Sequence, residues 1–256
     1  MMEVATIIQP APAGGARQLF LLFPDAGQPS ESLAAMAGRL AEAFPAAAAL
    51  VVQGPLSVGK GRRWLTVPAL AEDQTSAQGG GGQSVEAGAA GLVGLEEGVL
   101  ARAVDAALPG FIRCVRHWQN EMQVSPAATA LLGQGEGGTM ALAAALSPGE
   151  PPVCARVTAV GGRYALVTAP VPTQVLVHLL HGKQDQAVHF SHALRTAEQL
   201  VRADADITAD VVPHENHVLG TELQDWVMKR LQTQVPRHVW EAAMRQAQAQ
   251  GGQEEP

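Results

Sequence analysis

Residues 127–138, with the sequence AATALLGQGEGG, predict a buried strand that turns at once into a helix. The first half is apolar, as is typical of a strand in the interior of a sheet. Glycines then stand at Gly133, Gly135, Gly137 and Gly138, and glycine tolerates the close backbone approaches that a sharp turn requires. The helix that follows is predicted over residues 139–146.

Outside this stretch, apolar runs alternate with segments of helical spacing. The other predicted strands are residues 19–23, 50–52, 157–160, 175–181 and 207–212. The other predicted helices are residues 31–43, 99–122 with a kink at Pro109, 190–202, 221–231 and 237–247. Because each parallel strand needs a crossover to return, this alternation favours an α/β fold with a mostly parallel sheet and helices on both faces.

The composition indicates one domain over residues 1–256. The chain is 47% hydrophobic, which is enough to bury one large core. Residues 75–98 contain four consecutive glycines and few large side chains, so we expect a flexible insertion there. Residues 248–256 are polar, and we expect a disordered tail.

Charge and cysteine usage exclude several classes of protein. A net charge of −7 provides no basic stripe for nucleic acid. No run approaches the roughly 18 apolar residues of a membrane span, and the N-terminus does not resemble a signal peptide. Cys114 and Cys154 have neither disulfide-scaffold nor zinc-site spacing. We therefore expect a soluble, cytoplasmic protein.

The glycine-rich turn resembles the G-x-S-x-G elbow that carries a nucleophilic serine between a strand and a helix, with Gly135 at the serine position. Gly133, Gly135 and Gly138 also fit a loose G-x-G-x-x-G dinucleotide fingerprint. That pattern lacks a convincing acidic residue about 20 positions later. A tight turn without a ligand is a third interpretation.

An aspartate and a histidine follow the turn in the chain order of a hydrolase triad. Asp185 comes just after the predicted strand at 175–181, and His217 follows the strand at 207–212. In a triad, Asp185 would orient His217, and His217 would move the proton. Taken singly, Asp185 could instead cap the next helix, and His217 could be a surface histidine.

Three His-x-x-His pairs raise the alternative of a metal site: His178/His181, His189/His192 and His214/His217. The first pair lies on a predicted strand, where residues three apart point to opposite faces. The second could meet on a helix, but no third ligand is evident. We therefore predict no metal and no cofactor.

From about residue 19 to residue 244, the chain resembles the YpfH-type bacterial carboxylesterases, in the phospholipase/carboxylesterase branch of the α/β-hydrolases. The resemblance is carried by residues 21–23, 63–64, 72–73, 111–112, 115–119, 162–165, 181–182, 185, 217 and 235–238. It implies an α/β-hydrolase fold and a serine-triad esterase acting on small carboxylic esters or thioesters.

Two departures from that family fall at the site itself. Members carry serine at the position of Gly135, and a His-Gly pair where this chain has Pro24 and Asp25. The oxyanion hole would use the backbone N–H groups of Ala26 and Glu136, since Pro24 cannot donate. Asp25 would oppose an oxyanion if its side chain pointed inward.

Three hypotheses follow. In the first, the chain is a pseudoenzyme: it has lost serine-esterase catalysis but still binds a small acyl-ester or thioester ligand. Loss of a triad nucleophile costs about 10⁶-fold in turnover in subtilisin. In the second, the chain is a working hydrolase that uses either an unusual nucleophile or a water molecule activated directly by His217 and Asp185. In the third, the insertion serves protein interaction.

Overall fold

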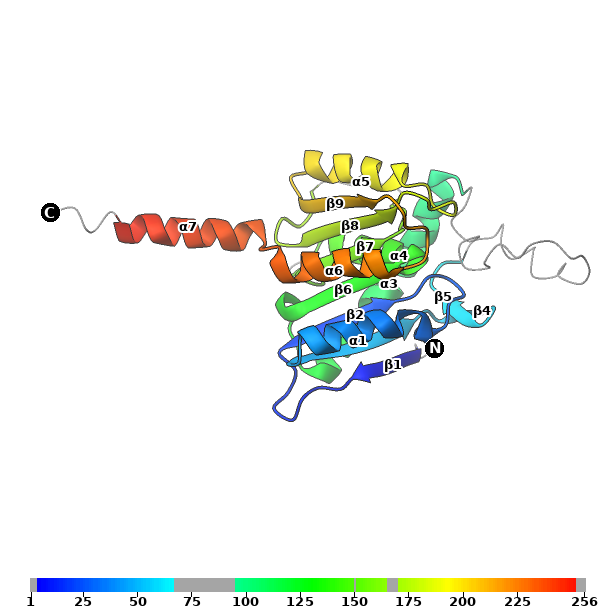
Figure 1. Ribbon diagram of the computed structural model, residues 1–256, viewed down its shortest axis with the longest axis horizontal. Coiled ribbons are helices and arrows are strands. Elements are labelled where there is room, and N and C mark those ends of the chain that lie inside the picture. Colours follow the sequence, from blue (N-terminus) through cyan, green and yellow to red (C-terminus); the bar gives the residue numbers. More distant parts are fainter. Residues whose placement is uncertain (1–3, 67–94, 150, 165–169, 252–256) are drawn as a thin grey trace, which may run out of the picture.

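The computed structural model describes residues 4–66, 95–149, 151–164 and 170–251. Seven strands form a central sheet in the order β1-β3-β2-β6-β7-β8-β9 (Figure 1). They are β1 (Val4–Gln9), β2 (Gln18–Phe23), β3 (Ala47–Gln53), β6 (Thr129–Gln134), β7 (Arg156–Val160), β8 (Leu176–Gly182) and β9 (Asp206–Val212). Every neighbouring pair is parallel except β1 with β3, so the predicted mostly parallel sheet is confirmed.

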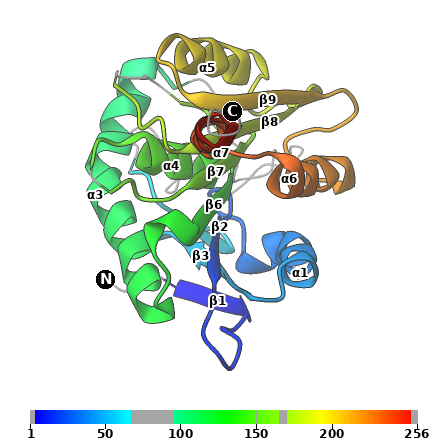
Figure 2. The same cartoon turned by 90° about the vertical axis from the view of Figure 1, so that its left-hand side faces the viewer.

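Helices cover both faces of the sheet (Figure 2). Helices α1 (Ala34–Ala43) and α6 (Thr221–Thr233) lie on one face, and α3 (Glu97–Met122), α4 (Gly135–Leu146) and α5 (Ser191–Arg202) lie on the other. Each layer buries its apolar side chains against the strands. Leu100, Phe111 and Met140 belong to one buried cluster, and Met36 and Val227 belong to the other. Both faces of the sheet are thus covered, as is typical of a mostly parallel sheet.

The parallel strands bring four loops to one edge of the sheet. The carboxyl ends of β2, β6, β8 and β9 lead directly to Asp25, Gly135, Asp185 and His217, respectively. These strands are joined through parallel pairs, so their carboxyl ends point the same way. Ligand sites of open α/β sheets gather at this edge.

Helix α4 begins at Gly135, four residues before its predicted start. Of the glycines that we assigned to a turn, Gly133 lies in β6, whereas Gly135, Gly137 and Gly138 lie in the first turn of α4. They let the helix lie tightly against the strands. A Cβ on Gly133 would stand 2.3 Å from the carbonyl oxygen of Gly137, and one on Gly137 would stand 2.2 Å from that of Phe23. Both approaches are possible only for glycine.

Several other expectations need correction. Strand β1 and the hairpin of β4 (Leu56–Val58) and β5 (Gly61–Arg63) were not predicted. Of the flexible insertion expected at 75–98, residues 97–98 are helical, because α3 starts at Glu97, and residues 75–94 lie outside the described chain. The tail expected at 248–256 is helical as far as Gly251, since α7 (Arg237–Gly251) continues through alanine and glutamine, both good helix formers. Residues 252–256 lie outside the described chain.

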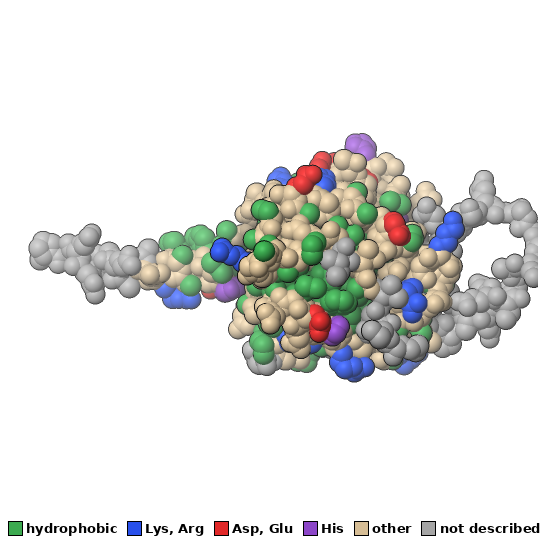
Figure 3. Space-filling view, turned by 90° about the horizontal axis from the view of Figure 1, so that it is seen from below, with side chains coloured by type: hydrophobic (Ala, Val, Ile, Leu, Met, Phe, Trp, Pro, Cys, Tyr) green, Lys and Arg blue, Asp and Glu red, His purple; other side chains and the backbone are tan. Residues whose placement is uncertain are grey.

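Helix α7 extends away from the body of the protein, and Figure 3 shows hydrophobic side chains along it. Val239, Trp240 and Met244 are exposed there, with Trp240 at 59%. In the part of the chain that is described, no helix combines the length and apolar character needed to cross a membrane.

Candidate active site

The turn between β6 and α4 has the backbone geometry of a sharp elbow. Gly135 has a φ of +53°, a left-handed conformation that L side chains rarely adopt. The next residue, Glu136, directs its backbone N–H out of the first turn of α4 toward Asp25. The free N–H groups and positive end of a helix favour an anionic group at this place.

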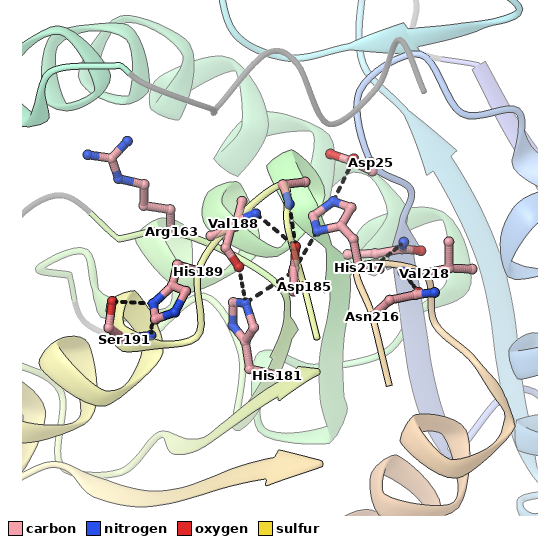
Figure 4. A network of polar contacts seen from close by, with 12 residues as sticks. Asp25, Arg163, His181, Asp185, Val188, His189, Ser191, Asn216, His217 and Val218 are labelled. Carbon is pink, nitrogen blue, oxygen red and sulfur yellow. Dashed lines mark hydrogen bonds and ion pairs between the residues drawn. The ribbon is translucent and has the colours of Figure 1, made fainter. Parts of the chain in front are cut away.

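The anionic group at the elbow is the side chain of Asp25, from the loop after β2. Its Oδ1 accepts the Glu136 N–H at 2.7 Å, and its Oδ2 lies 3.1 Å from Nε2 of His217 (Figure 4). The residue is only 3% exposed. One carboxylate therefore contacts both the elbow N–H and the histidine.

Asp25 also fills the volume that a side chain at position 135 would need. A Cβ built on Gly135 would lie 2.1 Å from Oδ1 and 2.2 Å from Cγ of Asp25. These separations are far below van der Waals contact, so a side chain at 135 and the inward position of Asp25 exclude each other. Glycine at 135 is the condition under which Asp25 can point inward.

His217 lies between two carboxylates. Its Nδ1 is 2.8 Å from Oδ2 of Asp185, on the side opposite Asp25 (Figure 4). Burial by itself would lower the pKa of His217, but hydrogen bonds with Asp185 and Asp25 and their negative charges raise the pKa to about 10. The ring is therefore an imidazolium at neutral pH, with a proton on both nitrogens.

Asp185 is fixed from several directions. Its Oδ1 accepts the backbone N–H groups of Ala187 and Val188 at 2.8 Å each, and its Oδ2 is also 3.1 Å from Nε2 of His181. Burial opposes the charge on Asp185, but the bonds from His181 and His217 outweigh it and lower the pKa of the carboxyl. Asp185 is therefore an ionised partner for the imidazolium, and these hydrogen bonds orient its carboxylate.

The loop that carries His217 is pressed against the end of β8. A Cβ on Gly182 would stand 2.3 Å from the backbone oxygens of both Glu215 and Asn216. Gln134, the last residue of β6, donates from Nε2 to the backbone oxygen of His217 at 3.0 Å. These contacts position the loop of His217, and with it the imidazole, at the carboxyl ends of β6 and β8.

The side chain of Glu136 points away from Asp25 into a separate buried ion pair. It accepts from Nη2 of Arg63 at 3.0 Å and from the backbone N–H groups of Trp64 at 2.6 Å and Leu65 at 3.3 Å. Burial raises the pKa of Glu136, although Arg63 and the two N–H groups oppose that shift. The pair ties the chain after β5 to the first turn of α4.

The structure brings together Gly135, Asp185, His217 and the backbone of Glu136 from the predicted site. Ala26, the other predicted oxyanion donor, is buried in the same loop as Asp25. The sequence did not predict that the side chain of Asp25 points inward; it indicated only what an inward Asp25 would do. The contact of His181 with Asp185 was not predicted either. Among the residues with described positions, no cluster of histidine, cysteine and acidic side chains is arranged to hold a metal ion.

Comparisons with known proteins agree with this architecture. The family described as Phospholipase/Carboxylesterase matches residues 93–234. Esterase YpfH of Escherichia coli (strain K12) is 30% identical over 236 residues, which cover 91% of this chain and 90% of that protein.

Solved structures share the fold at lower identity. Esterase PE8 superposes with a TM-score of 0.73 at 18% identity, covering 90% of this chain and 98% of that one. A carboxylesterase from Mesorhizobium loti gives 0.63 at 17% identity, covering 87% and 92%. The α/β-hydrolase fold is thus confirmed, and an esterase family implies ester substrates. The chain belongs to the phospholipase/carboxylesterase family.

Proposed function

We propose that this member of an ester-hydrolase family does not use the acyl-serine mechanism, because the carboxylate of Asp25 has replaced the serine side chain at the elbow. The observation that carries the proposal is the overlap of Asp25 with any side chain at position 135. An acyl-enzyme requires an activated hydroxyl or thiol at the tip of the elbow, and Gly135 supplies neither.

The occupied N–H group supports the same conclusion. In acyl transfer, the Glu136 N–H would stabilise the developing oxyanion. Here the Glu136 N–H donates to Oδ1 of Asp25 at 2.7 Å. An ester or thioester carbonyl in this place would meet a filled donor and a negative charge. We therefore expect weak binding of the small acyl-ester or thioester ligands that the sequence suggested.

Direct activation of water by His217 is the weaker alternative. A general base must have a free lone pair at the working pH. The contacts with Asp25 and Asp185 keep His217 protonated, with its pKa raised to about 10. Water attack through His217 therefore requires that the negative charge of Asp25 be removed first.

Turnover of short p-nitrophenyl esters by four proteins tests the proposal: the unmodified chain, Gly135→Ser, Asp25→Gly and the double variant. We expect measurable turnover only in the double variant, because a serine needs the space that Asp25 vacates. In subtilisin, loss of the triad costs about 10⁶-fold in turnover, which sets the upper limit for the gain.

Two further measurements make the test decisive. Adding His217→Ala to the double variant should abolish the gained turnover. A Gly135→Ser variant as active as the double variant would show that Asp25 does not obstruct the elbow. Strong ester turnover by the unmodified chain, lost in His217→Ala, would contradict the proposal outright.

Other predictions from the sequence remain predictions. These are a single domain over residues 1–256, a cytoplasmic location and a role of the insertion in protein interaction. Residues 75–94 of that insertion lie outside the described chain. Deleting them should abolish partner capture in a pull-down if the interaction hypothesis is right, and unchanged capture would count against it.

A further inference from the structure

We propose that Asp25 is itself a nucleophile, which attacks a saturated carbon bearing a halide, and that His217 and Asp185 then hydrolyse the alkyl ester formed on Asp25. The inference rests on the proposed function, in which Asp25 stands in for serine, and adds a substrate class to it. Carboxylate side chains are established covalent nucleophiles in other enzymes.

The two oxygens of Asp25 have different surroundings. The difference matches the two steps of the proposed reaction, which are attack on the carbon and hydrolysis of the resulting ester. Oδ2 lies 3.1 Å from Nε2 of His217, where the attacking atom of a triad is found. Oδ1 lies 2.7 Å from the Glu136 nitrogen, where an oxyanion is stabilised. Figure 4 shows Asp25 and Asp185 on opposite sides of the His217 ring. One oxygen of this carboxylate thus lies at the nucleophile position, and the other lies at the oxyanion position.

The basicity of a carboxylate selects the substrate class. An attack on an ester carbonyl would have to expel an alkoxide, which is about as basic as hydroxide and therefore more basic than a carboxylate by roughly twelve powers of ten. The adduct would expel Asp25 instead. Displacement of a halide from saturated carbon has no such reversal, because a halide leaves as a stable anion without a proton donor.

In the first step, a lone pair on Oδ2 of Asp25 forms a bond to the carbon while the carbon–halogen bond breaks. The halide leaves with the bonding electrons, and Asp25 becomes a neutral alkyl ester. One of the two negative charges beside His217 is then gone. Because Asp25 contributes to the raised pKa of His217, that pKa falls, and the ring can release its Nε2 proton to solvent.

In the second step, the neutral Nε2 takes a proton from water as the water oxygen bonds to Cγ of Asp25. The negative charge of the adduct develops on Oδ1, which already receives the Glu136 N–H. The adduct collapses by breaking the bond between Cγ and the alkyl-bearing oxygen, which takes the proton from Nε2 of His217 and leaves as the alcohol. The carboxylic acid left on Asp25 then gives its proton back to Nε2. Asp25 is again a carboxylate and His217 again an imidazolium, and the net change is alkyl halide plus water to alcohol, halide and one proton.

Bromoethane is a suitable small probe, with bromide release as the first readout. The unmodified chain should release bromide catalytically. Asp25→Asn keeps the shape of the side chain but is not a nucleophile, so release should fall to the level of buffer. His217→Gln should perform the first step and stop, which leaves an ethyl group on Asp25 that peptide mass spectrometry can locate.

The origin of the oxygen gives a second, independent readout. Because water attacks Cγ, a single turnover in heavy-oxygen water should label the Asp25 carboxyl and leave the alcohol unlabelled. Asp225, whose side chain is 61% exposed, is the internal control for unspecific alkylation.

A folded His217→Gln variant with no more ethylation at Asp25 than at Asp225 would overturn the proposal, as would label appearing first in the alcohol. Either outcome would leave Asp25 as an obstruction of the elbow only. The ester assays of the Gly135→Ser and Asp25→Gly variants would still report on the proposed function separately.

Discussion

Gly135→Ser should destabilise the protein far more than the serine side chain alone explains, because it displaces Asp25. Two contributions add at this position. A non-glycine residue with φ of +53° costs about 1 kcal/mol. Displacing the Asp25 carboxylate removes its hydrogen bonds with Glu136 and His217, worth about 2–3 kcal/mol together because they are charged and buried. The total is about 3–4 kcal/mol, or roughly 6–16 °C in Tm for a chain of this size.

A double-mutant cycle separates the two contributions. Asp25→Gly removes the same hydrogen bonds and should cost about 2–3 kcal/mol. The double variant with Gly135→Ser should cost only about 3–4 kcal/mol, because the serine then displaces nothing. The sum of the single variants exceeds that figure by about 2–3 kcal/mol, which is the expected coupling energy.

Gly59 offers a matched control. Its φ is +54°, nearly that of Gly135, but nothing lies within 4 Å of a Cβ built there. Gly59→Ser therefore measures the backbone strain alone, about 1 kcal/mol. Urea unfolding of all variants gives the free energies. If Gly135→Ser costs no more than Gly59→Ser, or if the cycle is additive within about 0.5 kcal/mol, Asp25 does not occupy the elbow in solution.

Three further expectations follow from the buried charges and from α7. The pKa of His217 is raised to about 10. A folded pKa above the unfolded value of about 6.5 adds stability that is complete below pH 6.5 and disappears as the pH rises to 10. The free energy of unfolding should therefore be higher at pH 7 than at pH 10, and Asp25→Asn should shrink this difference. Glu136→Gln leaves the Arg63 guanidinium buried without its charge partner and should cost about 3–5 kcal/mol by urea unfolding, whereas a cost near zero would show that the pair is solvated. Removing residues 239–256 should change Tm by only a few degrees, because the described apolar side chains of α7 are exposed; a large loss would mean that α7 packs against the body.

The sequence predicted the parallel sheet and the meeting of Asp185 with His217, because both depend on local signals. An apolar run ending in a polar loop marks the carboxyl end of a buried strand, and those ends meet at one sheet edge. Strand β1 had a weaker signal, since it is an edge strand whose described side chains are partly exposed and so lacks a continuous apolar run.

The direction of Asp25 could not be predicted in this way. Nothing in the residues around Asp25 determines whether its side chain faces solvent or the elbow. The direction depends on the space at Gly135, 110 positions later, and on the N–H and imidazolium that attract a carboxylate there. The buried pair of Arg63 with Glu136 was missed for the same reason, because its partners are 73 residues apart.

The overlap also orders the two departures from the family that the sequence resemblance implies, at Gly135 and at Asp25. A serine at 135 and an inward Asp25 cannot coexist, because Cβ and Oδ1 would be 2.1 Å apart. Along any path of single substitutions, a chain with serine at 135 could accept aspartate at 25 only with its side chain turned out of the site. On the proposed function, loss of a serine at 135 must therefore precede the inward carboxylate, which then gives the Glu136 N–H a partner and His217 a second partner. Gly135 and Asp25 act as one unit, so neither residue alone determines the chemistry of this site.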